Sequence, residues 1–481
     1  MPVSRNQGWQ RLAILVLVAV AARGLTFGNP IAGVDEEFYF TVGRAMWSGA
    51  LPFVDVWDRK PIGLFLLYAV PAGFGFPAGI WVYQALALAA VVATGWLIAR
   101  LAERSGYAAG ATAAGIAYIL WLGLLGGHGG QSPVFYNLPT IAAVLLILRS
   151  ATGAARRRAG VGAMALVGIG LQIKYSLVFE GMFFGLWLLA AEWREARTVS
   201  ALLGYGALLV AVSVLPTALA AAFYAAIGHW DAFLYANFLS ILRRNPDGLL
   251  ELASNFGRIV LIMSPLVASA IVALVRSAPF AASEPGRARR FVAIWLAVAI
   301  GSVLIFRPWF DHYALPILLP ACAAAAEMLG SDGWRRRFTP ALLAIAAIGG
   351  QIVLLTSSAG RGNATQFAAL TRTVGRGPGC LYLYSGSTML YASTQRCSLS
   401  RYIMPSHLSR TREAGATGVD QDQEIRRILA AGPAVVVIRP PYRGERPAAH
   451  RLVTQAMARD YRLAAQLPMG SELVSVYRRS R

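Results

Sequence analysis

Residues 9–61 read WQRLAILVLVAVAARGLTFGNPIAGVDEEFYFTVGRAMWSGALPFVDVWDRKP and contain the features that decide the fold class of this chain. The apolar run over 9–27 is long enough to cross a bilayer as a helix. Three consecutive carboxylates, Asp35, Glu36 and Glu37, then open a stretch with the pattern of an amphipathic helix at a membrane interface. No small-residue cleavage site stands out before Asp35, so the run is typical of a retained anchor rather than a signal peptide.

The composition of the chain extends this interpretation. Its 481 residues are 57% hydrophobic and 14% charged, which excludes an ordinary soluble enzyme and also a disordered chain. Apolar runs recur along the sequence and predict a polytopic α-helical membrane protein with about eleven spans. These runs lie at 9–27, 79–99, 107–127, 133–150, 159–173, 175–191, 200–227, 256–276, 291–306, 313–330 and 339–357.

The net charge of +21 is carried largely by short arginine clusters between the apolar runs. With a cytoplasmic N-terminus, all of these clusters fall on the cytoplasmic side, as the positive-inside rule requires. They are Arg100 and Arg104, Arg156 to Arg158, Arg194 and Arg197, Arg276 with Arg287 to Arg290, and Arg335 to Arg337. The charge therefore indicates a bilayer partner and argues against nucleic acid.

This topology predicts a transmembrane domain over residues 1–357, with outer-face loops at 28–78 and 228–255. Within the first loop, residues 61–76 are apolar but short and contain Pro71, so we expect them to be re-entrant. Residues 358–481 are expected to form a small periplasmic α/β domain. Its predicted strands are 380–384, 434–438 and 473–477, and its predicted helices are 421–429 and 450–466.

Cys380 and Cys397 both lie in this outer domain. An oxidising periplasm favours a disulfide between them, and two free thiols are the alternative. The spacing of the three cysteines matches no metal site, and we expect none.

The outer loop also contains Lys60, one of only two lysines among 44 basic residues; the other is Lys174. A compact ammonium suits a phosphate as a point charge, although a lysine beside a bilayer can equally extend toward the headgroups. The acidic cluster likewise has a structural alternative, since carboxylates in the first turn of a helix complement its dipole.

Together these motifs resemble the GT-C membrane glycosyltransferases of the protein O-mannosyltransferase and aminoarabinose (lipid A) transferase type. The resemblance rests on Asp35-Glu36 after the first span, Tyr39, the Arg44-Ala-Met-x-x-Gly helix and the Asp-x-x-x-Lys-Pro motif that contains Lys60. Further matches are Gly168 to Lys174 and Arg307-Pro-Trp-Phe-Asp-His-Tyr313, so the resemblance covers roughly residues 10–330.

The resemblance implies a GT-C-like fold and a transferase that moves a sugar, hexosyl or pentosyl, from a polyprenyl-phosphate carrier to a lipid, glycan or protein acceptor on the periplasmic face. Asp35 would be the general base, supported by Glu36, and Lys60 would contact the donor phosphate. A carboxylate can take the proton of an attacking hydroxyl, and a phosphate leaving group needs cationic stabilisation. A single displacement inverts the anomeric carbon. We expect no required cofactor; dependence on a divalent metal stays open.

The remaining candidates are less specific. Arg59, Lys174 and Arg307 are further candidates for the donor phosphate, with an Arg307–Asp311 ion pair as the alternative for Arg307. Tyr39, Arg44, Asp58, Gln131, His312 and Tyr313 are assigned to substrate binding. Residues 128–139 contain no carboxylate, unlike many relatives. His229, Arg243 and Arg244 are expected to contact lipid headgroups.

Two other function classes fit the same composition. A transporter or flippase of a lipid-linked sugar would also need many spans, but transporters place charges at the membrane midplane and often contain repeats. A surface-polysaccharide polymerase or ligase would differ in its acceptor.

Overall fold

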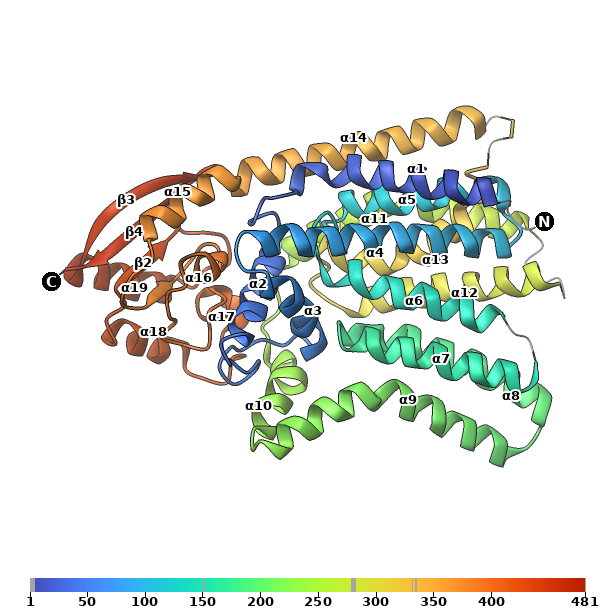
Figure 1. Cartoon of the computed structure of the whole chain (residues 1–481), viewed down its shortest axis with the longest axis horizontal. Helices are drawn as coiled ribbons and strands as arrows, with labels where there is room; N and C mark the ends of the chain where they lie inside the picture. Colours follow the sequence, from blue (N-terminus) through green and yellow to red (C-terminus); the bar gives the residue numbers. More distant parts are fainter. Residues whose placement is uncertain (1–4, 150–151, 278–282, 331, 334, 481) are drawn as a thin grey trace. The chain divides into compact units, whose positions relative to one another are not determined.

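The computed structural model describes residues 5–149, 152–277, 283–330, 332–333 and 335–480. They form two compact units. The helical unit comprises the residues up to Leu25, Ala85–Leu219 and Gly248–Leu354, and the mixed unit comprises Thr26–Gln84, Ala220–Asp247 and the residues from Leu355 onward. The colours of Figure 1 show that each unit is assembled from distant parts of the sequence.

A helix lies in each of the eleven predicted apolar runs. These helices are α1 (Arg5–Arg23), α4 (Ala78–Arg104), α5 (Ala111–Leu124), α6 (Ser132–Arg149), α7 (Gly153–Leu171), α8 (Val178–Ala196), α9 (Val199–Ala226), α11 (Leu249–Arg276), α12 (Glu284–Ile305), α13 (Leu318–Ala325) and α14 (Arg335–Arg361). Among the described residues, eight helices are long and apolar enough to cross a membrane. The prediction of a polytopic helical membrane protein is thus confirmed, whereas the count of eleven spans stays a prediction.

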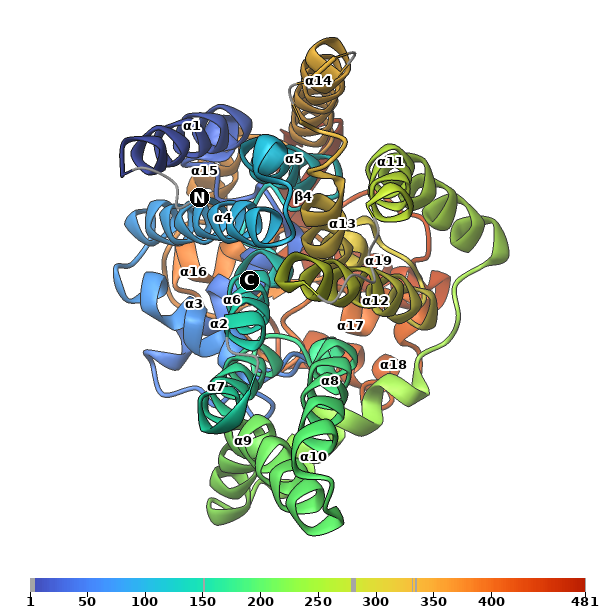
Figure 2. The same ribbon diagram turned by 90° about the vertical axis from the view of Figure 1, so that its right-hand side faces the viewer.

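Small residues let neighbouring helices of this unit approach closely. A Cβ atom at Gly115 on α5 would lie 2.7 Å from the carbonyl oxygen of Gly95 on α4, so a larger residue would force the two helices apart. Without a hydrophobic driving force between helices in lipid, such close backbone packing contributes much of the association energy. Figure 2 views these helices nearly end-on, with α5 beside α1 and α13.

The mixed unit contains the remaining helices and a four-stranded sheet. From the N-terminal loops come α2 (Val34–Met46), α3 (Ile62–Gly73) and α10 (Trp230–Leu234). The later part adds α15 (Ala364–Val374), α16 (Met389–Thr394), α17 (Ser406–Ser409), α18 (Gln421–Ala430) and α19 (Pro447–Asp460). The sheet order is β1 (Leu381–Leu383), β2 (Val435–Ile438), β4 (Glu472–Arg479), β3 (Tyr461–Met469), with β1 and β2 parallel and the other pairs antiparallel.

The predicted strands at 380–384, 434–438 and 473–477 are confirmed as β1, β2 and β4. The predicted helix over 450–466 is wrong in its second half, because α19 ends at Asp460 and β3 begins at Tyr461. Strand β3 lies at the edge of the sheet and pairs only with β4, across a turn at Gly470 with φ of 63°. Its residues are mostly exposed, so they lack the buried alternation by which a strand is recognised.

Two further expectations concern how the outer segments are organised. Residues 26–84 and 220–247 belong to the same compact unit as the residues from 355 onward, so the outer loops pack with the tail. The predicted division into domains at 357/358 falls within α14 and stays a prediction. Residues 62–73 form the 12-residue helix α3, which is too short to span a bilayer, and their re-entrant position also stays a prediction.

Candidate active site

Helix α2 carries the three carboxylates in its first turn, directly after Gly33. Successive residues of a helix point about 100° apart, so the three side chains must enter different environments. Asp35 is partly exposed, whereas Glu36 and Glu37 are 2% and 3% exposed. Simple complementation of the helix dipole does not require burial. Two of the three carboxylates are therefore held inside the mixed unit.

Glu36 folds back over the residue that precedes the helix. A Cβ atom at Gly33 would lie 2.1 Å from its Oε2 atom, so this position has room only for glycine while the carboxylate stays there. In the described part of the chain this Oε2 atom has no hydrogen-bond partner. Burial, and then the neighbouring Asp35, raise the pKa of Glu36 to about 7, against the opposing effects of its own backbone and Arg361. Glu36 can therefore gain or lose a proton near neutral pH.

Glu37 anchors α2 to residues far away in the sequence. Its Oε1 atom lies 2.5 Å from Nη2 of Arg361 at the end of α14, and its Oε2 atom accepts a hydrogen bond from the Ser387 hydroxyl. Arg361 also donates to the carbonyl oxygen of Ile31, just before the acidic cluster. Burial raises the pKa of Glu37 to about 7, and Arg361 and Ser387 act in the opposite direction. Arg361 and Ser387 were missed because nothing near them in the sequence indicates this contact.

Tyr39 is the centre around which the predicted catalytic groups gather. The Lys60 Nζ atom lies 5.6 Å from the centre of the Tyr39 ring and 4.0 Å from Oδ1 of Asp58. Burial, followed by the charges of Asp35 and Asp58, raises the pKa of the Tyr39 phenol well above its usual value. The structure therefore brings Asp35, Tyr39, Asp58 and Lys60 together.

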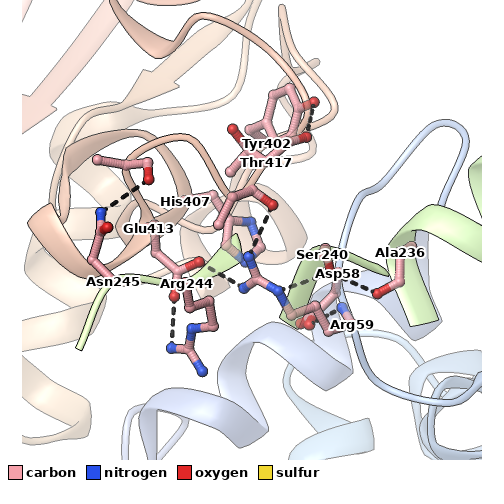
Figure 3. A network of polar contacts seen from close by, with 12 residues as sticks. Asp58, Arg59, Ala236, Ser240, Arg244, Asn245, Tyr402, His407, Glu413 and Thr417 are labelled. Carbon is pink, nitrogen blue, oxygen red and sulfur yellow. Dashed lines mark hydrogen bonds and ion pairs between the residues drawn. The ribbon is translucent and has the colours of Figure 1, made fainter. Parts of the chain in front are cut away.

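Arg59 binds groups of its own chain (Figure 3). Its Nη1 atom lies 2.6 Å from Oε2 of Glu413, its Nε donates to the Ser240 hydroxyl, and its Nη2 donates to a backbone carbonyl oxygen. Its guanidinium also lies 4.7 Å from the ring centre of Trp57. These contacts give Arg59 a structural role that the sequence did not predict, and leave Lys60 as the better candidate of the two for the donor phosphate.

Glu413 is the common partner of two arginines. Its Oε1 atom lies 2.6 Å from Nη2 of Arg244, so the expected headgroup contact of Arg244 is replaced by an ion pair with a buried carboxylate. Burial raises the pKa of Glu413, but Arg59 and Arg244 outweigh it and the pKa lies below its usual value. No sequence pattern indicated this network, because its members come from three separate segments. Arg243 lies 5.4 Å from the Tyr235 ring centre and is exposed.

His407 lies beside the same network in Figure 3. Its ring is 5% exposed and stands perpendicular to that of Trp57, with 4.6 Å between the ring centres. Burial lowers the pKa of His407 to about 4; Arg59 and Lys60 add to the lowering, and Asp58 and Glu413 oppose it. The imidazole is therefore neutral at pH 7.

The contribution of this buried histidine to stability should decrease in acid. In the unfolded chain this histidine has an ordinary pKa near 6.5, whereas in the folded chain its pKa is about 4. The contribution of His407 to folding is thus fully present above pH 6.5 and is lost as the pH falls toward 4. We expect the unfolding midpoint of wild type, relative to that of His407→Phe, to fall as the pH is lowered through this window, measured by thermal unfolding of both proteins. Identical pH profiles for wild type and variant would contradict the assignment, and Glu36 and Glu37 titrate equally in both.

A second group of predicted residues lies in the helical unit. The Lys174 Nζ atom lies 4.6 Å from the ring centre of Tyr313, and the rings of His312 and Tyr313 are 4.9 Å apart. Arg307 lies 5.4 Å from the ring centre of Trp309. Asp311 pairs with Arg258 at 3.3 Å, which corrects the expected alternative of an Arg307–Asp311 pair.

The remaining candidates are more dispersed. Gln131 is 8% exposed, between α5 and α6 of the helical unit, and Arg44 lies in the last turn of α2, partly buried, in the mixed unit. The expected disulfide is present between Cys380 and Cys397. Within the described ranges, no group of three or more histidine, cysteine or acidic side chains is arranged to hold a metal ion.

Comparison with solved structures shows the fold. The ArnT protein from Cupriavidus metallidurans is similar over 98% of both chains, with a TM-score of 0.65 and 15% identity in the apo state, and 0.66 and 14% when bound to undecaprenyl phosphate. The chain has the GT-C fold. The Archaeoglobus fulgidus oligosaccharyltransferase in its apo form is similar over 91% of this chain and 70% of its own, with a TM-score of 0.55 and 13% identity. No family model and no curated protein matches the sequence.

Proposed function

We propose that this protein is a glycosyltransferase that takes a sugar from a polyprenyl-phosphate carrier and passes it to an acceptor hydroxyl by inverting displacement. The observation that carries the proposal is the gathering of Asp35 and Lys60 around Tyr39, which joins a partly exposed carboxylate and an ammonium in one site. The fold adds support, because a protein of the same fold has been solved with undecaprenyl phosphate and another with dolichol-phosphate and a peptide.

In this mechanism Asp35 accepts the proton of the acceptor hydroxyl as its oxygen attacks the anomeric carbon. The bond between that carbon and the phosphate oxygen breaks, and the polyprenyl phosphate leaves with the bonding electrons. Lys60 stabilises the additional negative charge on the phosphate, so no general acid is needed. Glu36 acts behind Asp35: a pKa of about 7 lets it stay protonated next to a charged Asp35.

The proposed setting is the periplasmic face of a bacterial inner membrane, where a lipid donor arrives from the side and the acceptor from water or lipid. The bilayer and the polyprenyl-phosphate sugar are the proposed partners, together with a lipid, glycan or protein acceptor. This displacement balances without a cofactor.

A transfer assay tests the proposal directly. Purified protein in nanodiscs is supplied with polyprenyl-phosphate sugars carrying a labelled sugar, and with acceptor fractions from a bacterial envelope. We expect the label to move to an acceptor in a protein-dependent way. Movement of intact labelled lipid across vesicles, with no transfer from any donor, would contradict the proposal and favour a flippase.

Lys60→Ala should weaken donor binding selectively. A hydrogen bond to a charged group is worth about 1.5–3 kcal/mol, so the Kd for polyprenyl phosphate should rise roughly 10- to 100-fold. Lys60→Arg is the matched control, because it keeps the charge and should retain most of the affinity. The affinity is measured by titration with fluorescent polyprenyl phosphate. If it is unchanged in Lys60→Ala, Lys60 does not bind the donor phosphate and only extends toward the lipid headgroups.

A further inference from the structure

The mixed unit contains a polar cavity of about 430 Å³ that is wide open to solvent and takes no part in the proposed transfer step. It is formed by the loop before Lys60, by residues 398–402 and by the region around α18. Its polar lining comes mainly from Asp55, Ser400, Arg401, Tyr402, Glu424 and Arg427. The volume lies within the usual range for sites that bind small molecules.

The charges around this cavity cancel. Asp55 and Glu424 supply two carboxylates, and Arg401 and Arg427 supply two guanidinium groups, although the chain as a whole has a net charge of +21. An anionic ligand would be recognised by a surplus of cations, and a cationic ligand by a surplus of carboxylates. A balanced set of strong donors and acceptors instead suits a neutral ligand with many hydroxyl groups, since each hydroxyl both donates and accepts.

These side chains are held in defined positions. Glu424 is bound by both Nε and Nη2 of Arg427 and accepts a hydrogen bond from the Ser400 hydroxyl at 2.6 Å. Tyr402 is 5% exposed, and its hydroxyl donates to the carbonyl oxygen of Thr417, as Figure 3 shows. Arg401 donates to the Tyr402 hydroxyl, and its guanidinium lies 5.1 Å from the centre of that ring.

The cavity is linked to the candidate active site by one short loop. Asp55 lines the cavity, and Lys60 follows five residues later. Between them, the Trp57 backbone N–H donates to the carbonyl oxygen of Arg401, and the rings of Trp57 and Tyr402 lie 5.5 Å apart. A ligand in the cavity would therefore contact the same loop that positions Lys60.

From this geometry we propose that the cavity binds an uncharged saccharide unit of the acceptor. The proposal rests on the proposed glycosyltransferase function and adds to it the chemical class of the acceptor, a glycan or glycolipid with a neutral sugar close to the transfer point. The carboxylates accept from the sugar hydroxyls, the guanidinium groups donate to them, and the Tyr402–Arg401 pair borders the site.

Binding can be tested without any transfer. Full-length protein in nanodiscs is examined by saturation-transfer difference NMR with neutral methyl hexopyranosides, methyl glucuronide and inorganic phosphate as probes. We expect signals from at least one neutral hexopyranoside. Val419→Trp, which fills the cavity from its edge, should remove them, and Leu463→Trp, which adds the same side chain at an exposed position on β3, should leave them intact.

Arg427→Gln provides a second variant in case Val419→Trp disturbs folding. Arg427 is 54% exposed, so the substitution should be tolerated while removing one donor pair and the charge balance. Where transfer is measured, either cavity variant should raise the acceptor KM about tenfold, equivalent to about 1.4 kcal/mol, with the donor KM unchanged.

The outcomes separate this inference from the proposed function. The cavity assignment would be wrong if neutral-sugar signals were equal in wild type and both cavity variants. It would also be wrong if only glucuronide and phosphate bound, and either result would count even if transfer occurs. If wild-type protein binds neutral sugars through the cavity but transfers no sugar, the binding site is supported and the proposed transferase function is contradicted.

Discussion

Asp35→Asn should lower the rate of sugar transfer by about 10²–10⁴-fold, the usual contribution of a positioned general base. The amide has nearly the same shape but cannot accept the proton of the acceptor hydroxyl. Polyprenyl-phosphate binding should be unaffected, because Lys60 remains. The measurement is the initial rate of label transfer at saturating donor, together with donor Kd by titration.

Asp231→Asn is the matched control for this prediction. Asp231 also lies in the first turn of a helix, α10, and is exposed in the same unit, so the substitution removes a comparable interaction with a helix dipole. Its transfer rate should equal that of wild type. If Asp35→Asn and wild type transfer sugar at equal rates, Asp35 is not the general base and its role is limited to complementing the helix dipole.

Glu413→Gln should produce the largest loss of stability. The substitution leaves Arg59 and Arg244, which are 12% and 22% exposed, without their shared carboxylate. Removal of one partner from a buried ion pair typically lowers the free energy of unfolding by about 3–5 kcal/mol. We expect a clearly lower unfolding midpoint in detergent and a higher donor KM, because Arg59 no longer fixes the loop that carries Lys60.

Asp460→Asn tests whether this effect depends on burial. Asp460 also pairs with an arginine, Arg459, but at an exposed site, where an ion pair contributes little. Its unfolding midpoint should not change. A midpoint for Glu413→Gln equal to that of wild type would show that solvent replaces the carboxylate and that the network in Figure 3 does not hold the loop.

Much of the fold was predictable because it depends on local composition. Apolar runs of sufficient length become helices in lipid, and each predicted run contains one. Strands β1, β2 and β4 were predictable from short β-branched or aromatic stretches. Strand β3 was not, because its pairing with β4 decides its conformation and its own residues are mostly exposed.

For the site, the sequence placed Asp35, Glu36, Lys60 and Tyr39 in one loop region, which the fold brings together in space. The sequence could not distinguish between adjacent residues of similar chemistry. Asp35, Glu36 and Glu37 are chemically similar, and only packing leaves Asp35 partly exposed while it buries the other two. Arg59 and Lys60 are both cations, yet only Arg59 is held by Glu413.

The sequence by itself thus determined the membrane setting, the helical class and the short segment that carries the reactive groups, because hydrophobic length and residue type act locally. Only the tertiary structure decided which carboxylate stays accessible, which cation is bound internally and where a neutral polar cavity forms. Those outcomes depend on contacts such as Glu37–Arg361 and Arg59–Glu413, whose partners lie hundreds of residues apart. The energy of a buried charge depends on what the fold places beside it, and no local pattern encodes that neighbour.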